Sequence, residues 1–308
     1  MRSVPSSRSA LLVVALALAV PAGARAQDRG PFRIDTTVSV GREAIVDLGL
    51  ISGDVVVTAA DRGEVRIRAS SEYIPLRFEH VGNTVRVSTE SGRYRRSGEQ
   101  RMEVVVPVGA RVRASSVSGN VSVRGTHGEL EANSVSGDVT VEDVTRRASL
   151  SSVSGNVRAR DLDADVRVRA VSGDVTIERV VGEIDAESVS GEVSLRRAQS
   201  DRVHAESVSG EITYDGSIAR DGRYDFSSHS GNVHLSIPDN AGISLGASTF
   251  SGSVNSSLPA TLGPSESSGS RRGRRMDLTI NGGGARVTAQ TFSGDIIIDR
   301  ASGRPDRE

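Results

Sequence analysis

A short phrase recurs along this chain: Ser-Gly, then Asp, Asn, Glu or Ser, then Val or Ile. It occurs ten times, with its glycines at Gly53, Gly119, Gly137, Gly155, Gly173, Gly191, Gly210, Gly231, Gly252 and Gly294. The spacing is 18 residues from Gly119 to Gly191 and then becomes 19, 21, 21 and 42 residues. Repetition at a fixed period of this size is typical of a solenoid, in which each repeat forms one coil of a stack.

Apolar or small residues alternate with polar ones on both sides of each glycine. The apolar positions lie seven, five and three residues before the glycine, and two and four residues after it. In the repeat of Gly137 they are Leu130, Ala132, Ser134, Val139 and Val141. A period of two predicts a half-buried β-strand on each side of the glycine, and no segment sustains the 3.6-residue period of a helix.

The sequence therefore predicts an all-β fold: a single-stranded parallel β-helix or β-solenoid with 18–21-residue coils and two short strands per coil. We expect the Ser, Gly and acidic residues of the phrase to turn the chain, because Gly tolerates a close approach between coils. We expect its valines to fill the core, since Trp is absent and aromatic residues make up only 3% of the chain. Right-handed winding is expected, because parallel crossovers usually have that hand.

The ends of the chain and two breaks in the repeat define the expected organisation. Residues 1–26 have the form of a signal peptide, with a charged start, an apolar run over 10–20 and an Ala24-Arg25-Ala26 cleavage site, which predicts export with cleavage after Ala26. The expected sections are a linker over 27–37, the solenoid over 38–300 and a disordered tail over 301–308. Within the solenoid they are irregular coils over 61–115 with room for a hairpin, regular repeats over 116–256, a flexible loop over 259–275 and closing coils over 276–300.

Composition narrows the range of partners. The chain has no cysteine, so disulfides cannot hold the fold and the signal is not that of a lipoprotein. Removal of the signal would take away three arginines and no acids, which shifts the formal net charge from −1 to about −4. We therefore expect no nucleic-acid partner, and no segment after the signal is apolar and long enough to span a membrane.

The array of Ser-Val-Ser-Gly-Asp/Asn/Glu-Val segments resembles the bacterial DUF4097 family, whose members are also described as adhesins with β-strand repeats. The residues that carry the resemblance are 116–121 and the copies at 134–139, 152–157, 188–193 and 207–212, together with the approach Val104-Val105-Val106-Pro107. The resemblance covers roughly residues 38–300 and implies a β-helical protein of the cell envelope or exterior. It implies no reaction for any residue of this chain.

A polar ladder beside the glycines is the first candidate site. Its members are Asp54, Asn120, Asp138, Asn156, Asp174, Glu192, Glu211, Asn232 and Asp295. Stacked carboxylates suit Ca²⁺, but the glycine-rich loop that wraps the ion in calcium β-rolls does not recur here. We therefore interpret the ladder as turn-forming structure, and we expect no metal ion and no other cofactor.

Catalytic residues are not indicated by any motif. The histidines are scattered, at His80, His127, His204, His229 and His234. Some arginines are expected on outward strand positions, such as Arg158, Arg160, Arg167 and Arg169. We interpret them as part of an ordinary solvated charged face and not as members of a catalytic pair. We accordingly assign no catalytic residue, and we interpret the basic cluster Arg271, Arg272, Arg274 and Arg275 as a solubilising part of its loop.

These features predict a non-enzymatic, exported β-solenoid that acts as an adhesin-like or envelope interaction scaffold. Its expected partner is an envelope component, a glycan or a protein, in the periplasm, at the cell surface or outside the cell. Two alternatives stay open from the sequence: a carbohydrate-active β-helix enzyme, and a calcium-stabilised structural β-roll. Any localised function is expected on outward strand positions, in residues 61–115, or in the loop over 259–275.

Overall fold

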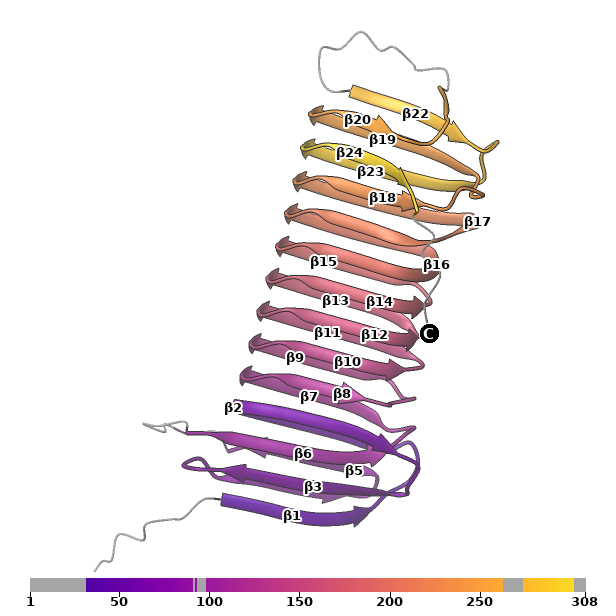
Figure 1. Ribbon diagram of the computed structural model, residues 1–308. Helices are drawn as coiled ribbons and strands as arrows, with labels where there is room; N and C mark the ends of the chain where they lie inside the picture. The colour runs from indigo at the N-terminus through magenta and orange to yellow at the C-terminus, as the bar shows by residue number, and fades with distance from the viewer. Residues whose placement is uncertain (1–31, 91, 93–97, 263–273, 302–308) are drawn as a thin grey trace, which may run out of the picture.

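A computed structural model describes residues 32–90, 92, 98–262 and 274–301 of the protein (Figure 1). All regular secondary structure in these ranges is β-strand, and the strands form one elongated stack of coils. The predicted all-β solenoid is therefore confirmed. The expected signal peptide and the tail over 302–308 lie outside the described residues, and the described part of the chain contains no helix that could cross a membrane.

One side of the stack, which we call sheet 1, consists of the strands that lead into the Ser-Gly corners. In spatial order these are β4 (Leu76–Val81), β5 (Thr84–Thr89), the first half of β2 (Ile45–Ala60), β7 (Arg111–Ser118), β9 (Leu130–Ser136), β11 (Arg147–Ser154), β13 (Asp165–Ser172), β15 (Ile184–Ser190), the second halves of β16 (Val193–Ser209) and β17 (Ile212–Ser230), β23 (Ala285–Ser293), β19 (Ile243–Ser251), β22 (Arg274–Ile280) and β21 (Thr261–Leu262).

The other side, sheet 2, consists of the strands that leave those corners. In the same order these are β1 (Phe32–Ser39), β3 (Glu64–Ser71), β6 (Gln100–Pro107), the second half of β2, β8 (Val121–Arg124), β10 (Val139–Val144), β12 (Val157–Asp163), β14 (Val175–Val181), the first halves of β16 and β17, β18 (Val233–Ile237), β24 (Ile296–Arg300) and β20 (Val254–Ser256).

The register of the sheets follows the sequence repeat. Leu130 on β9 pairs with Ala148 on β11, which pairs with Val166 on β13, at steps of 18 residues. The inward residues of each ladder are fully buried, so the space between the two sheets is filled mainly by Val, Ile, Leu and Ala, as predicted. Each coil has a second corner, where the chain passes from sheet 2 back to sheet 1. β16 and β17 differ from the other strands because each continues through this second corner without a break.

The longer coils around β17 accommodate the largest core side chains. The ring of Tyr214 packs 5.8 Å from that of Tyr224 and 5.3 Å from that of Phe226. The hydroxyl of Tyr214 donates to the carbonyl of Ser217 at 2.7 Å, and that of Tyr224 donates to the carbonyl of Ser200 at 2.6 Å. Burial raises the pKa of both phenols, so each stays protonated and retains its hydrogen bond.

The order of the coils in space differs from their order in the sequence at both ends. At one end β2 lies between the strands of residues 84–107 and β7–β8, so Gly53 stacks directly on Gly119. At the other end β23 and β24 lie between the coil of β17–β18 and the coil of β19–β20. The closing residues of the sequence therefore form an internal coil and not the last coil of the stack (Figure 1).

Antiparallel strands cover most of the sheet ends. β4 and β5 form a hairpin that closes one end of sheet 1, and β3 and β1 continue sheet 2 beyond β6. At the far end β22 returns antiparallel to β19, and the short strand β21 adds to it. Residues 64–107 thus contain a hairpin in place of regular coils, and residues 261–262 and 274–275, within the region expected to be a loop, are strand. Residues 263–273 lie outside the described residues.

Candidate functional site

The Ser-Gly corner is built from two close contacts between successive coils. A Cβ on Gly119 would lie 2.0 Å from the carbonyl oxygen of Gly53, so no larger residue fits where the corners stack. The Ser or Thr three residues before the glycine points inward, and in seven coils its hydroxyl donates to the glycine carbonyl of the adjacent coil. This bond joins Ser116 to Gly53, Ser134 to Gly119, Ser152 to Gly137, Ser207 to Gly191, Ser228 to Gly210, Thr291 to Gly231 and Thr249 to Gly294.

The residue two positions before each glycine lies on the surface, whereas the Val or Ile two positions after the glycine packs in the core, as expected. Because Ser134 points inward, the next side chain along the strand, Val135, must point outward. The same holds in every coil and gives an exposed row that we call the apolar stripe: Ile51, Val117, Val135, Val153, Val171, Val189, Val208, His229, Phe292 and Phe250, in spatial order. Its nine hydrophobic members are between 38% and 53% exposed.

The sequence contained the signal for this stripe. Val135 follows Asn133 by two residues and Glu131 by four on the same strand. Since both of those positions point outward, the side chain of Val135 points outward too. The valines after the glycine, such as Val139 and Val141, are in the inward phase and are buried. A Val that repeats in the outward phase of every coil is not needed for the core and therefore indicates a surface role.

Aromatic rings form one end of the apolar stripe. The rings of His229 and Phe292 are stacked with centroids 4.9 Å apart and planes 8° apart, and those of Phe292 and Phe250 are 4.8 Å and 3° apart. Since neighbouring rings lie face to face along the solenoid, the middle ring, Phe292, has both faces covered. The stack therefore extends an apolar row and does not offer a series of free ring faces on which sugars could stack.

The polar ladder beside the stripe has a structural role in its hydrogen bonding. The side-chain oxygen of each Asp and Asn in the ladder accepts the backbone N–H of the adjacent coil, as when Asn120 Oδ1 accepts from Asp138 at 2.9 Å and Asp138 Oδ1 accepts from Asn156 at 2.8 Å. Burial would raise the pKa of Asp138, but the Asn156 N–H and the Arg158 guanidinium outweigh it and hold this pKa below the ordinary value. Among the described residues no three His, Asp or Glu side chains gather as metal ligands would.

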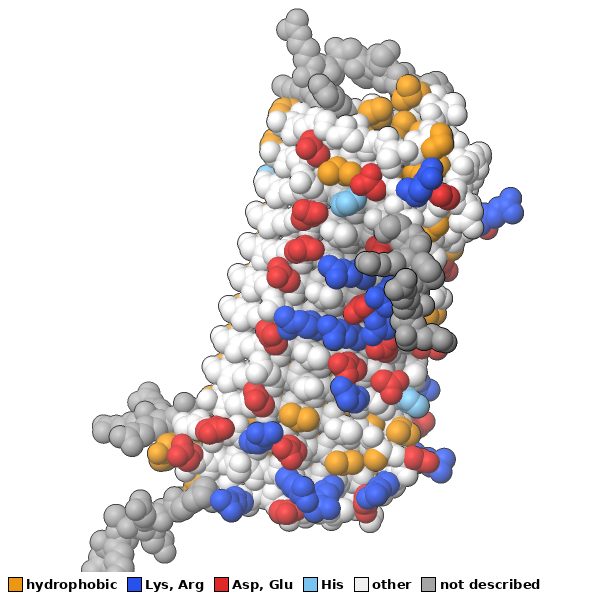
Figure 2. Space-filling view, viewed as in Figure 1, with side chains coloured by type: hydrophobic (Ala, Val, Ile, Leu, Met, Phe, Trp, Pro, Cys, Tyr) orange, Lys and Arg blue, Asp and Glu red, His pale blue; other side chains and the backbone are white. Residues whose placement is uncertain are grey.

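The outward charges of both sheets form ion pairs between adjacent coils. All four arginines considered above are paired: Arg158 with Asp138 at 2.7 Å, Arg160 with Glu178 at 3.5 Å, Arg167 with Asp185 at 2.8 Å, and Arg169 with Glu187 at 3.2 Å. Acidic and basic side chains are interspersed on the face seen in Figure 2. These carboxylates face arginines, whereas a glycosidase needs two carboxylates that face each other across a substrate.

The structure does not bring the histidines together. His80 lies on β4, His127 follows β8, His204 is on β16 near Glu206, and His229 is in the apolar stripe. His234 on β18 contacts a carboxylate of the neighbouring coil, with Nε2 2.9 Å from Oδ2 of Asp299. Each histidine therefore has a separate environment, and the described residues contain no histidine pair that could bind a metal or act in catalysis.

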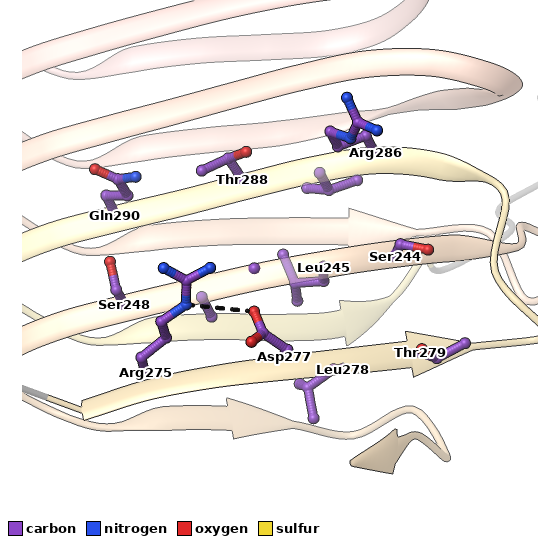
Figure 3. A pocket seen from close by; sticks show the side chains of 13 residues that line it. Ser244, Leu245, Ser248, Arg275, Asp277, Leu278, Thr279, Arg286, Thr288 and Gln290 are labelled. Carbon is purple, nitrogen blue, oxygen red and sulfur yellow. Dashed lines mark ion pairs between the residues drawn. The ribbon is translucent and has the colours of Figure 1, made fainter. Parts of the chain in front are cut away.

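A shallow polar hollow lies on the outer surface of β23, β19 and β22 (Figure 3). Gly246 on β19 has no side chain to fill it, and Arg275 and Asp277 reach towards β19 from β22 with Nε and Oδ1 3.5 Å apart. Arg275 is thus the one member of the predicted basic cluster whose side chain is described; it is exposed and paired. Arg271 and Arg272 lie outside the described residues.

Two solved structures are similar to this chain at low sequence identity. A Parabacteroides distasonis protein described as a "putative lipid binding protein" is 10% identical, with a TM-score of 0.48, over 88% of this chain and 97% of its own. A Bacteroides fragilis protein described as a "putative adhesin" is 12% identical, with a TM-score of 0.43, over 86% and 96%. The chain matches none of the curated proteins.

The family is given by the sequence match. The model of the Toastrack DUF4097 family matches residues 46–299, from β2 to the end of β24. The matched range therefore includes both the regular coils and the coils that lie out of sequence order in the stack. The chain belongs to the Toastrack DUF4097 family of β-solenoid proteins.

Proposed function

We propose that the protein is an exported, non-enzymatic β-solenoid that serves as an adhesin-like interaction scaffold at the cell envelope. The observation that carries this proposal is the apolar stripe. It recurs in ten coils, from Ile51 to Phe250, although the core does not require it. An exposed apolar row of this length is the kind of surface that proteins use for contact with other molecules.

The remaining surface supports an interaction role over a catalytic one. Outward arginines and carboxylates neutralise each other from coil to coil, as in Arg113 with Glu131 at 3.2 Å. The polar ladder is engaged in backbone hydrogen bonds, as in Asp174 N–H to Asn156 Oδ1 at 2.9 Å. The export signal expected over residues 1–26 would bring the scaffold to envelope components, whether protein or glycan. Repeated weak contacts along the stripe would add up through multivalency.

Cosedimentation with isolated cell envelopes tests the proposal. The chain from Gln27 onward contains every described residue and is compared with the double variant Val153→Asp, Val171→Asp, which places two charges in the centre of the stripe. We expect the wild type to sediment with the envelopes and the variant to lose at least tenfold in affinity. Thr140→Glu, on the outer face of sheet 2, is the matched control and should bind like the wild type. Equal binding by all three proteins would remove the stripe from the function.

A further inference from the structure

We propose that the apolar stripe binds the same stripe of a second copy of this chain, with the two solenoids side by side and pointing in the same direction. This inference rests on the proposed function, because it takes the stripe to be a contact surface and names the partner.

The area of the stripe is sufficient for a dimer. A fully buried Val, Leu or Phe side chain contributes on the order of 60–120 Å². Half-exposed members in ten coils therefore present roughly 300–600 Å², to which the exposed serines beside the row add further area. Two copies would bury about 1,000 Å² in total, which is the lower limit expected of a specific interface. A row one side chain wide would meet a flat partner poorly, so this area is reached only with a partner of matching shape.

Periodicity selects that partner. The residues directly before and after each stripe residue pair with their equivalents in the adjacent coil. Ser134 pairs with Ser152, and Ser118 pairs with Ser136. Its side chains therefore recur at the strand spacing of ~4.8 Å over about 43 Å. In Figure 1 the Ser-Gly corners, at the left ends of the coils, lie along a straight edge. Another ladder of the same pitch can pack against these side chains coil by coil over the whole length, as paired sheets do in steric zippers. A second copy of the chain has that pitch.

Chemistry argues against the other occupants. Six carboxylates of the polar ladder, from Asp54 to Asp295, lie around the corner from the stripe and disfavour an anionic membrane or nucleic acid. The stacked rings of Phe292 and its neighbours present edges outward, which suits apolar packing and not sugar stacking. On the sheet 1 side the rim is a mixed row: Ser115, Asn133 and Ser151 are small and uncharged, and the next three coils carry Arg169, Glu187 and Glu206.

The same carboxylates determine the direction of the pair. In an antiparallel pair, the twofold axis is perpendicular to the solenoids and brings sheet 2 beside sheet 2, so the two acidic ladders would face each other. In a parallel pair, the twofold axis runs along the solenoids and brings sheet 2 of one copy beside sheet 1 of the other. Each acidic ladder then faces a row of the other copy that is uncharged at Ser115, Asn133 and Ser151, basic at Arg169 and acidic at Glu187 and Glu206. This row carries far less negative charge than a second acidic ladder, so the parallel pair has the weaker like-charge repulsion.

The absence of cysteine makes a direct test possible. In a parallel pair every stripe position meets its own copy, so the single variant Val117→Cys should give a covalent dimer with a short bismaleimide. In a fully overlapped antiparallel pair the two copies of residue 117 would be seven steps, or about 34 Å, apart and out of reach. Thr140→Cys, on the outer face of sheet 2, is the control and should stay monomeric in the same reaction.

Sedimentation velocity supplies the second measurement. We expect the wild type from Gln27 onward to be a dimer at micromolar concentration, and Val153→Asp to raise the dissociation constant at least tenfold. Val153→Asn, without a charge, should weaken the dimer less, and circular dichroism of both variants shows whether the fold is kept. A wild type that stays monomeric at tens of micromolar overturns the inference, while envelope binding in the cosedimentation experiment would leave the proposed function standing. A dimer in which Val117→Cys does not cross-link overturns the parallel arrangement.

Discussion

The hydroxyl of Ser134 donates a 2.9 Å hydrogen bond to the carbonyl oxygen of Gly119 in the preceding coil. The hydroxyl of Ser188, at the same position in the coil after Ala170, is buried without a partner among the described residues. We expect Ser134→Ala to lower the free energy of unfolding by about 1 kcal/mol, the usual net value of such a bond. Ser188→Ala should be neutral or stabilising, because it removes an unsatisfied buried hydroxyl. Urea denaturation measures the free energy of unfolding of both variants. An equal loss in the two would contradict a stabilising role for the Ser134 hydrogen bond.

The corner glycines should tolerate no substitution. A Cβ on Gly155 would lie 2.2 Å from the carbonyl oxygen of Gly137, so Gly155→Ala must separate two coils. We expect a loss of about 2–4 kcal/mol in the free energy of unfolding, in the range of other overpacked sites. Gly246→Ala is the control, since its Cβ would meet nothing nearer than 3.6 Å. A comparable loss in both variants would mean that the glycine is needed for flexibility and not for the close approach.

The coil itself could be predicted from the sequence because its determinants are local. Leu130, Ala132 and Val139 are buried as their period of two predicts, and the close approach of the glycines follows from their repetition. The exposure of Val135 was also contained in that period. Val135 is not among the core positions predicted for its repeat, so the recurring apolar residue there was a surface signal that the prediction did not use.

The order of the coils at the ends could not be predicted in the same way. Ser293 pairs with both Ser230 and Ser251, which places the last coil of the sequence between two earlier ones. All three segments fit the same template, so the local pattern does not distinguish a coil added at the end from a coil inserted inside. The choice depends on non-local pairing, including the antiparallel return of β22 along β19. The ion pairs between coils could not be predicted either, because their prediction requires the register between adjacent strands.

The polar ladder should not depend on calcium. Asn156 Oδ1 and Asp174 Oδ1 accept the N–H groups of Asp174 and Glu192 at 2.9 Å and 3.0 Å, so these oxygens already have partners. We expect excess EDTA or millimolar CaCl₂ to change the melting temperature by less than about 1 °C, since only a ligand that binds the folded state shifts it. Differential scanning calorimetry in both solutions is the measurement. A clear rise with Ca²⁺ would restore the calcium-stabilised roll as the better description.

Stability should decrease in acid. The pKa of Asp138 is held below its ordinary value by the hydrogen bond from Asn156 and by Arg158, against the opposing effect of burial. The pKa of Asp295 is lowered by hydrogen bonds from Ser253. Because the folded pKa lies below the unfolded one, this stability is present above about pH 4 and is lost as the pH falls through the folded pKa. Melting temperatures from pH 7 to pH 2.5 should therefore fall in the acid part of the range.

Asp138→Asn is the matched variant for that pH profile. An amide oxygen can still accept the Asn156 N–H, as Asn120 does from Asp138, but the variant has no charge to lose. We expect its melting temperature to fall less between pH 5 and pH 2.5 than that of the wild type, with a lower value at pH 7 because the contact with Arg158 is weakened. Identical acid slopes would show that other carboxylates control the transition.

The second corner offers a stabilising substitution. One position of this corner has a left-handed backbone in successive coils. The coil of β8 has Gly125 there, with φ 78°, and the next four coils have Asp143, Asp161, Arg179 and Arg197, with φ of 57°, 56°, 52° and 51°. Such backbone costs a non-glycine residue about 1–2 kcal/mol. Arg197 makes one 3.4 Å contact with Glu178, whereas Arg179 holds Asp161 through two nitrogens.

We therefore expect Arg197→Gly to raise the free energy of unfolding by about 0.5–1 kcal/mol, after the entropy that glycine loses on folding is subtracted. Arg179→Gly relieves the same backbone but breaks the pair with Asp161, so it should gain less or lose stability. Urea denaturation of the two variants separates the backbone cost from the value of the ion pair. Destabilisation by Arg197→Gly would mean that the contact with Glu178 stabilises the fold by more than the left-handed backbone costs.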